Sequence, residues 1–181
     1  MERIQKQQII KDLDKKIVLL TGPRQVGKTW LAKEIGKEYS KTVYLNYDRY
    51  EDREIVDREE WLEDTQLLIL DELHKKQGWN NYLKGIYDTR PSNLRILVTG
   101  SARLDLFFFQ GDSLVGRFFK NRLLPFSLKE IINSGSDYNI RRLMERGGFP
   151  EPFITKDAVE AQRWRLQYIN GLLRTDILDF Q

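Results

Sequence analysis

Short apolar runs alternate along the chain with stretches whose apolar residues recur at helical spacing. Runs of strand type occupy residues 17–20, 42–47, 65–70, 94–99 and 118–124. The run around Leu67-Leu68-Ile69-Leu70 is apolar throughout, which is typical of a strand buried on both faces of a parallel sheet. Helical spacing follows the first run, from Trp30 to about Glu38, and recurs between Gln77 and Thr89. Strands that alternate with helices predict an α/β fold with a central sheet.

The pattern changes after residue 124. Pro125 ends the last strand-type run, and Ser127 with Glu130 has the spacing of a capping box for a helix through Ile132. Residues 147–152 (GGFPEP) are expected to form a rigid turn, and residues 157–181 have a helical pattern without a stop signal. We therefore expect a core over residues 1–132 and a helical extension over residues 133–181, which would lead into a C-terminal domain absent from this sequence.

The turn between the first strand and the first long helix carries the clearest chemical signal. Residues 21–30 read TGPRQVGKTW, which fits the phosphate-binding pattern G-x-x-x-x-G-K-[ST] at every fixed position. Glycines let the backbone wrap a polyphosphate with its N–H groups inward, and the helix adds its positive N-terminus. Lys28 is expected to reach the β- and γ-phosphates, and the Thr29 hydroxyl to bind Mg²⁺. The predicted nucleotide-binding residues are Gly22, Pro23, Arg24, Gln25, Val26, Gly27, Lys28, Thr29 and Trp30.

Two adjacent carboxylates, Asp71 and Glu72, follow the most apolar run. Downstream of a phosphate-binding loop, such a pair is typical of the metal and water site of P-loop ATPases. Asp71 would hold Mg²⁺ directly or through a water molecule, and Glu72 would act as the base that polarises the attacking water. Considered alone, Asp71 could also cap the next helix, and Glu72 could lie on the surface.

Hydroxyl groups follow the strand-type run at residues 94–99, in the sequence Thr99-Gly100-Ser101. Ligands of open α/β sheets bind at the carboxyl ends of the strands. Thr99 or Ser101 is therefore predicted to orient the water or to contact the γ-phosphate. Turn chemistry alone would explain Gly100-Ser101 equally well.

Composition excludes several other kinds of site. The chain of 181 residues has no cysteine and one histidine, which excludes disulfides and thiolate metal sites and argues against a histidine-rich zinc site. It has neither an apolar run long enough to span a bilayer nor an N-terminal signal sequence, so we expect a cytoplasmic protein. The net charge is +3, with an acidic stretch at residues 51–64 and a basic balance from Lys84 to Lys129. Charge is the only sign of nucleic-acid binding, and a solvated surface is the commoner explanation.

Five motifs, taken in order, resemble one known family. They are TGPRQVGKTWL, LLILDELHK, ILVTGSARLDL, SLVGRFFKNRLLPFSLKE and GGFPEP. Together they resemble the AAA-type ATPase domain found in many bacterial and archaeal proteins, where a C-terminal domain of unknown function follows it. The first two motifs are shared by many ATPases, whereas the order and spacing of the other three make the resemblance specific. It covers nearly all of residues 15–181.

The resemblance implies a P-loop fold whose parallel sheet has the strand order 5-1-4-3-2. Gly116-Arg117 matches a recurrent Gly-Arg pair of the family, so Arg117 is the candidate arginine finger, acting within the chain or on a neighbouring copy. Arg103 and Arg122 are alternatives, and a plain surface role would explain Arg117 equally well. A finger that acts on a neighbour would require a homo-oligomer. With the finger included, the predicted catalytic residues are Glu72, Lys28, Thr99, Ser101 and Arg117.

These signals favour an ATPase that binds ATP with Mg²⁺ and uses hydrolysis to change the shape of an attached domain or a partner. A nucleotide-gated binding module with negligible turnover would use the same loop. A small P-loop kinase is the third interpretation, but a glutamate after the aspartate favours water as the phosphate acceptor. ATP rather than GTP is inferred from the resemblance and from the absence of an N-K-x-D guanine-recognition sequence.

Overall fold

The computed structural model describes residues 1–100, 114–135 and 138–172. The chain divides into two compact units. Arg3–Leu123 form one unit, and Met1–Glu2 with the chain from Leu124 onward form the other. The division after Leu123 comes earlier than the boundary expected at residue 132. In the described part of the chain, no helix is both long and apolar enough to cross a membrane.

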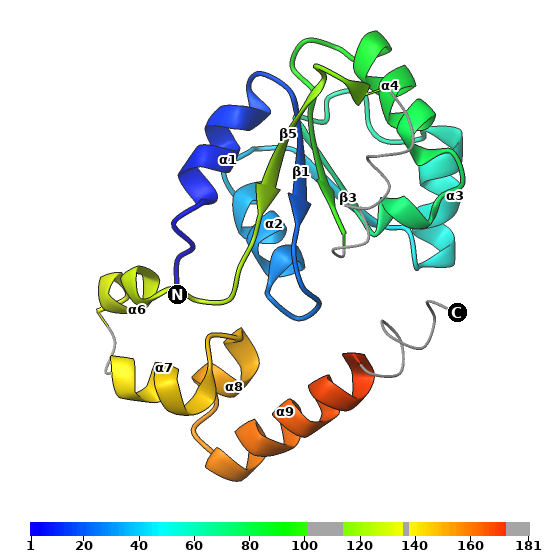
Figure 1. Cartoon of the computed structure of the whole chain (residues 1–181). Coiled ribbons are helices and arrows are strands. Elements are labelled where there is room, and N and C mark those ends of the chain that lie inside the picture. The colour runs from blue at the N-terminus through cyan, green and yellow to red at the C-terminus, as the bar shows by residue number, and fades with distance from the viewer. Residues whose placement is uncertain (101–113, 136–137, 173–181) are drawn as a thin grey trace. The chain divides into compact units, whose positions relative to one another are not determined.

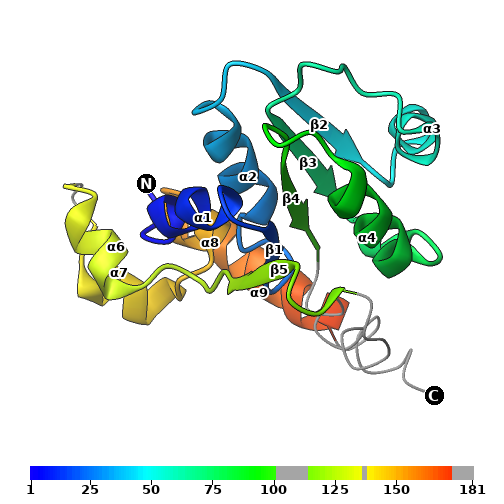
Figure 2. The ribbon, with the colours of Figure 1, turned by 90° about the horizontal axis from the view of Figure 1, so that it is seen from above.

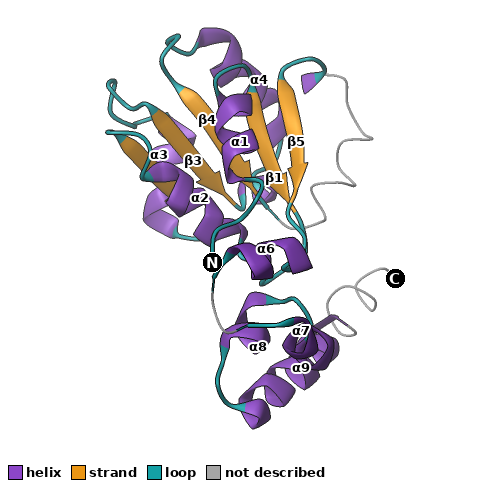
Figure 3. Ribbon diagram, turned by 90° about the vertical axis from the view of Figure 1, so that its left-hand side faces the viewer, coloured by secondary structure: helices purple, strands orange, loops and turns teal. Residues whose placement is uncertain are grey.

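The first unit is built on one parallel sheet of five strands. They are β1 (Ile17–Thr21), β2 (Thr42–Asn46), β3 (Leu67–Asp71), β4 (Arg95–Thr99) and β5 (Phe118–Arg122). Each strand is parallel to its neighbours, and the strands in Figure 3 run in the same direction. Their order across the sheet is β2-β3-β4-β1-β5, which confirms the predicted order 5-1-4-3-2 read from the opposite edge.

Helices cover both faces of this sheet. They are α1 (Lys6–Leu13), α2 (Lys28–Gly36), α3 (Tyr50–Arg58), the 3-10 turn η1 (Leu73–Lys75) and α4 (Trp79–Thr89). Figure 1 locates them along the chain, and Figure 2 shows α1 and α2 on one side of the sheet and α3 and α4 on the other. The sheet is therefore the middle of three layers.

Burial on both faces explains why the strands are apolar without alternation. All residues of β1 and β3 are buried. Leu68 and Leu70 point to one face of the sheet and belong to the same core cluster as Leu83 of α4. Ile69 points to the other face and lies under α2, because a Cβ atom built on Gly36 would come 3.4 Å from the Ile69 side chain. The two faces of β3 are thus covered by different helices, α4 on one side and α2 on the other.

The strands end together at one edge of the sheet. The register aligns Thr99 of β4 with Leu20 of β1 on one side and with Asp71 of β3 on the other. The loop after β1 and the side chains at the ends of β3 and β4 therefore lie next to one another. This carboxyl edge is where ligands of open α/β sheets bind.

The second unit is helical where the structure describes it. Its helices are α6 (Leu128–Asn133), α7 (Ile140–Arg146), α8 (Pro150–Ile154) and α9 (Ala158–Leu172). Ser127 and Glu130 form the predicted capping box at the start of α6. A small core joins α6 and α8 through Phe126, Ile131 and Phe153. The helix expected at the end of the chain is α9, and residues 173–181 lie outside the described residues.

The expected rigid turn at residues 147–152 is wrong in part. Gly147 ends α7 with a positive φ of 74°, but α8 already begins at Pro150. Proline fits the first turn of a helix because the N–H groups of that turn have no partner within the helix. The two glycines end one helix, and Pro150 starts the next.

Candidate functional site

The loop after β1 has the backbone that the phosphate-binding pattern requires. Gly22, Gln25 and Gly27 have positive φ values of 146°, 61° and 95°. A Cβ atom on Gly22 would lie 2.3 Å from the carbonyl oxygen of Leu123, so a side chain has no room there. Gly27 is the residue immediately before α2, and Lys28 and Thr29 form the first turn of that helix. The loop therefore delivers both side chains to the carboxyl edge.

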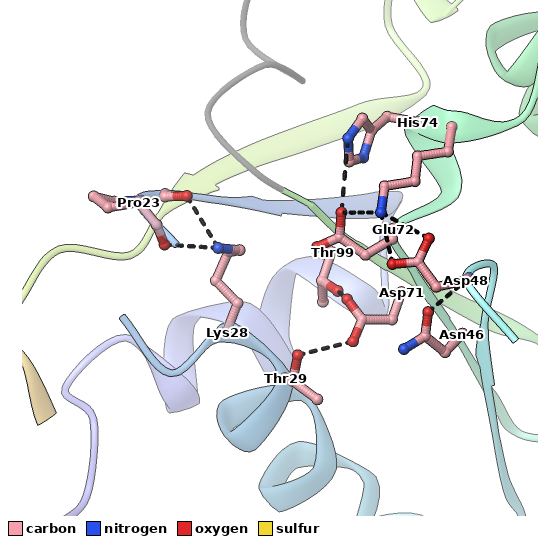
Figure 4. A network of polar contacts seen from close by, with 11 residues as sticks. Pro23, Lys28, Thr29, Asn46, Asp48, Asp71, Glu72, His74 and Thr99 are labelled. Carbon is pink, nitrogen blue, oxygen red and sulfur yellow. Dashed lines mark hydrogen bonds and ion pairs between the residues drawn. The ribbon is translucent and has the colours of Figure 1, made fainter. Parts of the chain in front are cut away.

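Lys28 lies inside the loop that precedes it. The side chain is 7% exposed, and its ammonium group donates hydrogen bonds to the carbonyl oxygens of Gly22 at 3.0 Å and Pro23 at 2.7 Å (Figure 4). Burial lowers the pKa of Lys28, and the nearby carboxylates of Glu72 and Asp71 act in the opposite direction. Lys28 is thus a buried cation enclosed by its own loop.

Asp71, the last residue of β3, collects hydrogen bonds from three hydroxyl groups. The Thr29 hydroxyl of α2 donates to Oδ2 at 2.8 Å, and the Tyr44 hydroxyl of β2 donates to the same oxygen at 2.7 Å. The Thr99 hydroxyl of β4 donates to Oδ1. Asp71 is 3% exposed, so these donors replace the water that a carboxylate otherwise needs. The alternative role of Asp71 as a helix cap is wrong, because its side chain bonds to these hydroxyls.

Glu72 follows with a left-handed backbone (φ 57°), and its N–H donates to the Thr99 carbonyl at 3.0 Å. Its carboxylate lies 3.7 Å from His74 Nε2 and 3.8 Å from Lys75 Nζ, and Lys75 also pairs with Asp48 (Figure 4). Burial raises the pKa of Glu72, as does the neighbouring charge of Asp71, whereas Lys75 and Lys28 lower it. Glu72 is thus a half-buried carboxylate beside the loop lysine.

Comparison with known proteins agrees with this geometry. A sequence model described as an AAA domain matches residues 14–132, which is more than half of the chain. The chain belongs to this AAA domain family. The match confirms the resemblance read from the motifs; it does not extend to the C-terminal domain that follows in the family.

Relatives of this AAA domain are longer than the chain. An uncharacterized protein of Mycobacterium tuberculosis is 30% identical over 162 residues, which cover 89% of the chain and 36% of the relative. An uncharacterized protein of Methanocaldococcus jannaschii is 27% identical over 148 residues, which cover 72% of the chain and 30% of that protein. The chain therefore spans about a third of the length of these curated relatives.

A solved structure shares the fold of this AAA domain. The Walker-type ATPase of Pyrococcus abyssi superposes with a TM-score of 0.64 at 16% identity, over 97% of this chain and 74% of that one. At this identity the likeness concerns the fold alone. Together with the family match, it identifies the fold as that of a P-loop NTPase.

The structure does not bring Arg117 to the phosphate loop of this AAA domain. Arg117 precedes β5, and its carbonyl accepts a hydrogen bond from Ile17 at the amino end of β1. The loop leaves β1 at Thr21, and four residues of strand span roughly 13 Å. The guanidinium group instead pairs with Asp88 of α4 at 2.9 Å, which lowers the pKa of that carboxyl. A finger from Arg117 within the same chain is therefore wrong.

The other predicted site residues differ in burial and position. Arg24, Gln25 and Trp30 are exposed around the loop, and Val26 is buried beneath it. Thr99 is fully buried and contacts Asp71, so it supports the carboxylate that was assigned to the metal. Ser101 and the alternative finger Arg103 lie outside the described residues. Arg122, the remaining alternative, pairs with Thr21 in the register and so lies at the edge that carries the loop.

Three residues that contact the site were given no role by the sequence analysis, although Lys75 stands at the end of the motif LLILDELHK. Tyr44 reaches Asp71, Lys75 reaches Glu72, and Arg3 reaches the loop itself, where its guanidinium donates to the Val26 carbonyl at 3.3 Å. Arg3 is 4% exposed although it stands near the start of the chain. Only Lys75 left a signal, because it follows the acidic pair by three residues. The other two depend on strand register and on the course of the chain before α1.

The oxygen atoms at this edge fit a magnesium ion. The Thr29 hydroxyl and the Asp71 carboxylate are hard oxygen ligands 2.8 Å apart, on α2 and β3. Mg²⁺ is usually held by one or two protein oxygens, with water and substrate phosphates completing its coordination. The described residues contain no cluster of three or more His, Cys, Asp or Glu side chains that would form a separate all-protein metal site. This donor set suits an ion shared with a bound phosphate.

Proposed function

We propose that this AAA domain binds ATP together with Mg²⁺ and hydrolyses it to ADP and phosphate. The observation that carries the proposal is the convergence of Lys28 and Thr29 with Asp71 at one edge of the sheet, joined by the hydrogen bond from Thr29 to Asp71. Glu72 stands beside them with a raised pKa. A phosphate cradle, a pair of oxygen ligands and a base are the parts that nucleotide hydrolysis needs.

Charge explains how the phosphates would bind. The Lys28 ammonium group donates hydrogen bonds to two neutral carbonyl oxygens of its own loop. Phosphate oxygens are stronger acceptors because they are charged, so Lys28 would exchange the carbonyls for the β- and γ-phosphates. The N–H groups of the loop and the N-terminus of α2 add to the attraction for an anion.

Glu72 would supply the base. The oxygen of a water molecule attacks the γ-phosphorus, the bond from that phosphorus to the oxygen of ADP breaks, and Glu72 takes the proton that the water loses. The raised pKa of Glu72 makes it a better proton acceptor than an ordinary glutamate once it is ionised. Mg²⁺ bound by Thr29 and Asp71 would neutralise part of the phosphate charge.

Thr99 offers a route from the nucleotide to the rest of the molecule. Its hydroxyl donates to Asp71, and its carbonyl accepts from the N–H of Glu72. A change at either carboxylate therefore reaches the end of β4. We propose that hydrolysis uses such contacts to drive a conformational change in an attached domain or a partner.

A nucleotide-gated binding module with negligible turnover is the second candidate. The contact of Glu72 with Lys75 favours it, because the positive charge of Lys75 lowers the pKa of Glu72 and so makes it a weaker base. In that case ATP binding alone would set the shape of the protein. Binding and turnover must therefore be measured separately.

The test compares the wild type with Glu72→Gln. Phosphate release from ATP and Mg²⁺ is followed over a range of protein concentrations, and ATP affinity is measured in parallel. Glu63→Gln, an exposed carboxylate in the segment after α3, is the matched control. We expect Glu72→Gln to bind ATP and to lose at least 100-fold in turnover, the order of a general base's contribution.

Each outcome decides between the candidates. Turnover that is lost in Glu72→Gln and kept in Glu63→Gln supports the hydrolase. ATP binding without turnover in all three proteins supports the nucleotide-gated module. Absence of ATP binding by the wild type overturns both.

A further inference from the structure

Tyr44 contacts the proposed site at the carboxyl edge of the sheet. Neither the sequence motifs nor the family match assigns a role to it. Its hydroxyl donates to Asp71 Oδ2 at 2.7 Å, and the same oxygen accepts the Thr29 hydroxyl at 2.8 Å. Tyr44 belongs to β2, the edge strand of the sheet, which supplies none of the expected site residues. The carboxylate assigned to the metal is thus held from a strand with no motif.

The register of β2 against β3 explains how Tyr44 reaches this position. Tyr44 pairs with Ile69, and Asn46 pairs with Asp71. Side chains alternate along a strand, so Tyr44, Ile69 and Asp71 point to the same face of the sheet. Asp71 is the diagonal neighbour of Tyr44, at a separation that a long aromatic side chain can bridge. That face is covered by α2, which brings Thr29 to the same carboxylate.

The ring of Tyr44 is held from α2 as well. The Lys33 ammonium group lies 4.4 Å from the ring centroid. Lys33 follows Thr29 by four residues and so lies on the same side of the helix. One face of α2 therefore contacts Asp71 through Thr29 and the Tyr44 ring through Lys33. The hydroxyl of Tyr44 is a hydrogen-bond donor to Asp71 from this fixed ring.

The two donors to Oδ2 are not equivalent when a cation is present. A Thr29 hydroxyl that gives a lone pair to Mg²⁺ can still donate its proton, but its position is then set by the ion as well as by Asp71. Tyr44 is not one of the proposed magnesium ligands. The Thr99 hydroxyl holds the other oxygen, Oδ1. Tyr44 is the donor that can keep Oδ2 oriented while Thr29 serves as a ligand.

We propose that Tyr44 is a positioning residue for Asp71, which it holds in the orientation needed to bind magnesium with nucleotide. This inference rests on the proposed function of the site. Hydrogen-bond partners of metal-binding side chains are worth about 10- to 100-fold in metal affinity. Tyr44 acts on Asp71 and contacts neither the phosphate loop nor Glu72 in any described hydrogen bond. Its loss should therefore weaken the magnesium-dependent part of nucleotide binding and spare the rest.

The test measures the affinity of the chain for a non-hydrolysable ATP analogue by calorimetry, once with EDTA and once with Mg²⁺. The ratio of the two Kd values is the gain in affinity due to magnesium. Tyr44→Phe keeps the ring above which Lys33 lies and removes only the hydroxyl. Tyr50→Phe is the matched control, because the exposed Tyr50 hydroxyl donates to Glu54 within α3.

We expect Tyr44→Phe to reduce the magnesium gain by about tenfold and to leave the Kd in EDTA unchanged, whereas Tyr50→Phe should keep the wild-type value of both. An unchanged gain in Tyr44→Phe overturns the inference and leaves the proposed function intact. An equal loss with EDTA and with Mg²⁺ also overturns it, since Tyr44 would then support the fold of the loop. A wild type without any magnesium gain overturns the proposed function and this inference together.

Discussion

Thr29 and Asp71 are 42 residues apart in the sequence, and their side-chain oxygens lie 2.8 Å apart. The contact joins the first turn of α2 to the last residue of β3. It connects the phosphate loop to the acidic pair, which are two separate motifs in the sequence. The two motifs therefore lie at one place in the structure, and a ligand of the loop is expected to change the surroundings of Asp71 as well.

Removal of the Lys28 ammonium group should weaken nucleotide binding strongly. Lys28→Ala takes away the buried cation that faces the loop interior, and a charge-assisted hydrogen bond to phosphate is worth about 1.5–3 kcal/mol. We expect a loss of at least tenfold in the affinity for ATP, measured as the Kd by calorimetry.

Lys37→Ala is the control for this prediction, because Lys37 is an exposed lysine that pairs with Glu34 next to the end of α2. Its Kd should equal that of the wild type. If Lys28→Ala bound ATP as tightly as Lys37→Ala, the assignment of the phosphate loop would be wrong.

A methyl group at Gly22 should disturb both the fold and the loop. The Cβ atom of Gly22→Ala would lie 2.3 Å from the Leu123 carbonyl oxygen, and the φ of 146° is unfavourable for alanine. We expect the free energy of unfolding to fall by about 1–3 kcal/mol, the range for overpacking in a filled interior. Urea denaturation measures this loss, and the Kd for ATP should rise in the same variant.

Gly85→Ala provides the comparison within the same unit. Gly85 lies inside α4, and a Cβ atom there would have no heavy atom within 4 Å. Alanine favours a helix over glycine by up to about 1 kcal/mol, so this variant should be as stable as the wild type or more so. A destabilised Gly85→Ala together with a stable Gly22→Ala would refute the steric argument.

Substitution of Arg117 can distinguish two roles of this residue, that of a surface ion-pair partner and that of an arginine finger acting on a neighbouring copy. Within the chain it pairs with Asp88, so Asp88→Asn breaks the same contact and leaves the arginine in place. We expect Arg117→Ala and Asp88→Asn to have equally small effects on stability, because exposed ion pairs contribute little. Turnover at low protein concentration should be unchanged in both.

Turnover per molecule at increasing protein concentration completes this test. A finger supplied by a neighbour would make the wild type faster as it assembles, and only Arg117→Ala would lose that gain, by 10³-fold or more if it resembles other arginine fingers. Equal behaviour of the two variants at all concentrations would assign Arg117 to the surface.

The sequence predicted the part of the site that depends on local backbone geometry. Gly22, Gly27 and Lys28 follow one another in a turn, so their spacing alone indicates a loop that encloses phosphate. The acidic pair could be predicted as well, because it follows an apolar strand-type run that is clear in the sequence. Strand order followed from the family resemblance, and the structure confirms it.

Contacts that depend on the register between strands could not be predicted from the sequence in this way. A tyrosine in an edge strand is ordinary, and only the pairing of Tyr44 with Ile69 brings its hydroxyl to Asp71. Arg117 was misplaced for the same reason, since a Gly-Arg pair does not tell which end of β1 it meets. Pro150 was taken for part of a turn because proline begins helices as readily as it ends them.

The buried Arg3 makes the beginning of the chain part of the nucleotide site. Its guanidinium holds the Val26 carbonyl, and the Gln5 side chain holds the carbonyl of Arg122 at the end of β5. The first contact holds the loop from outside its own motif, and the second holds the end of the neighbouring strand β5. Replacement of Arg3 would therefore alter the loop from a distance. Arg3→Ala should be compared with the wild type for ATP affinity before any variant of the loop is interpreted.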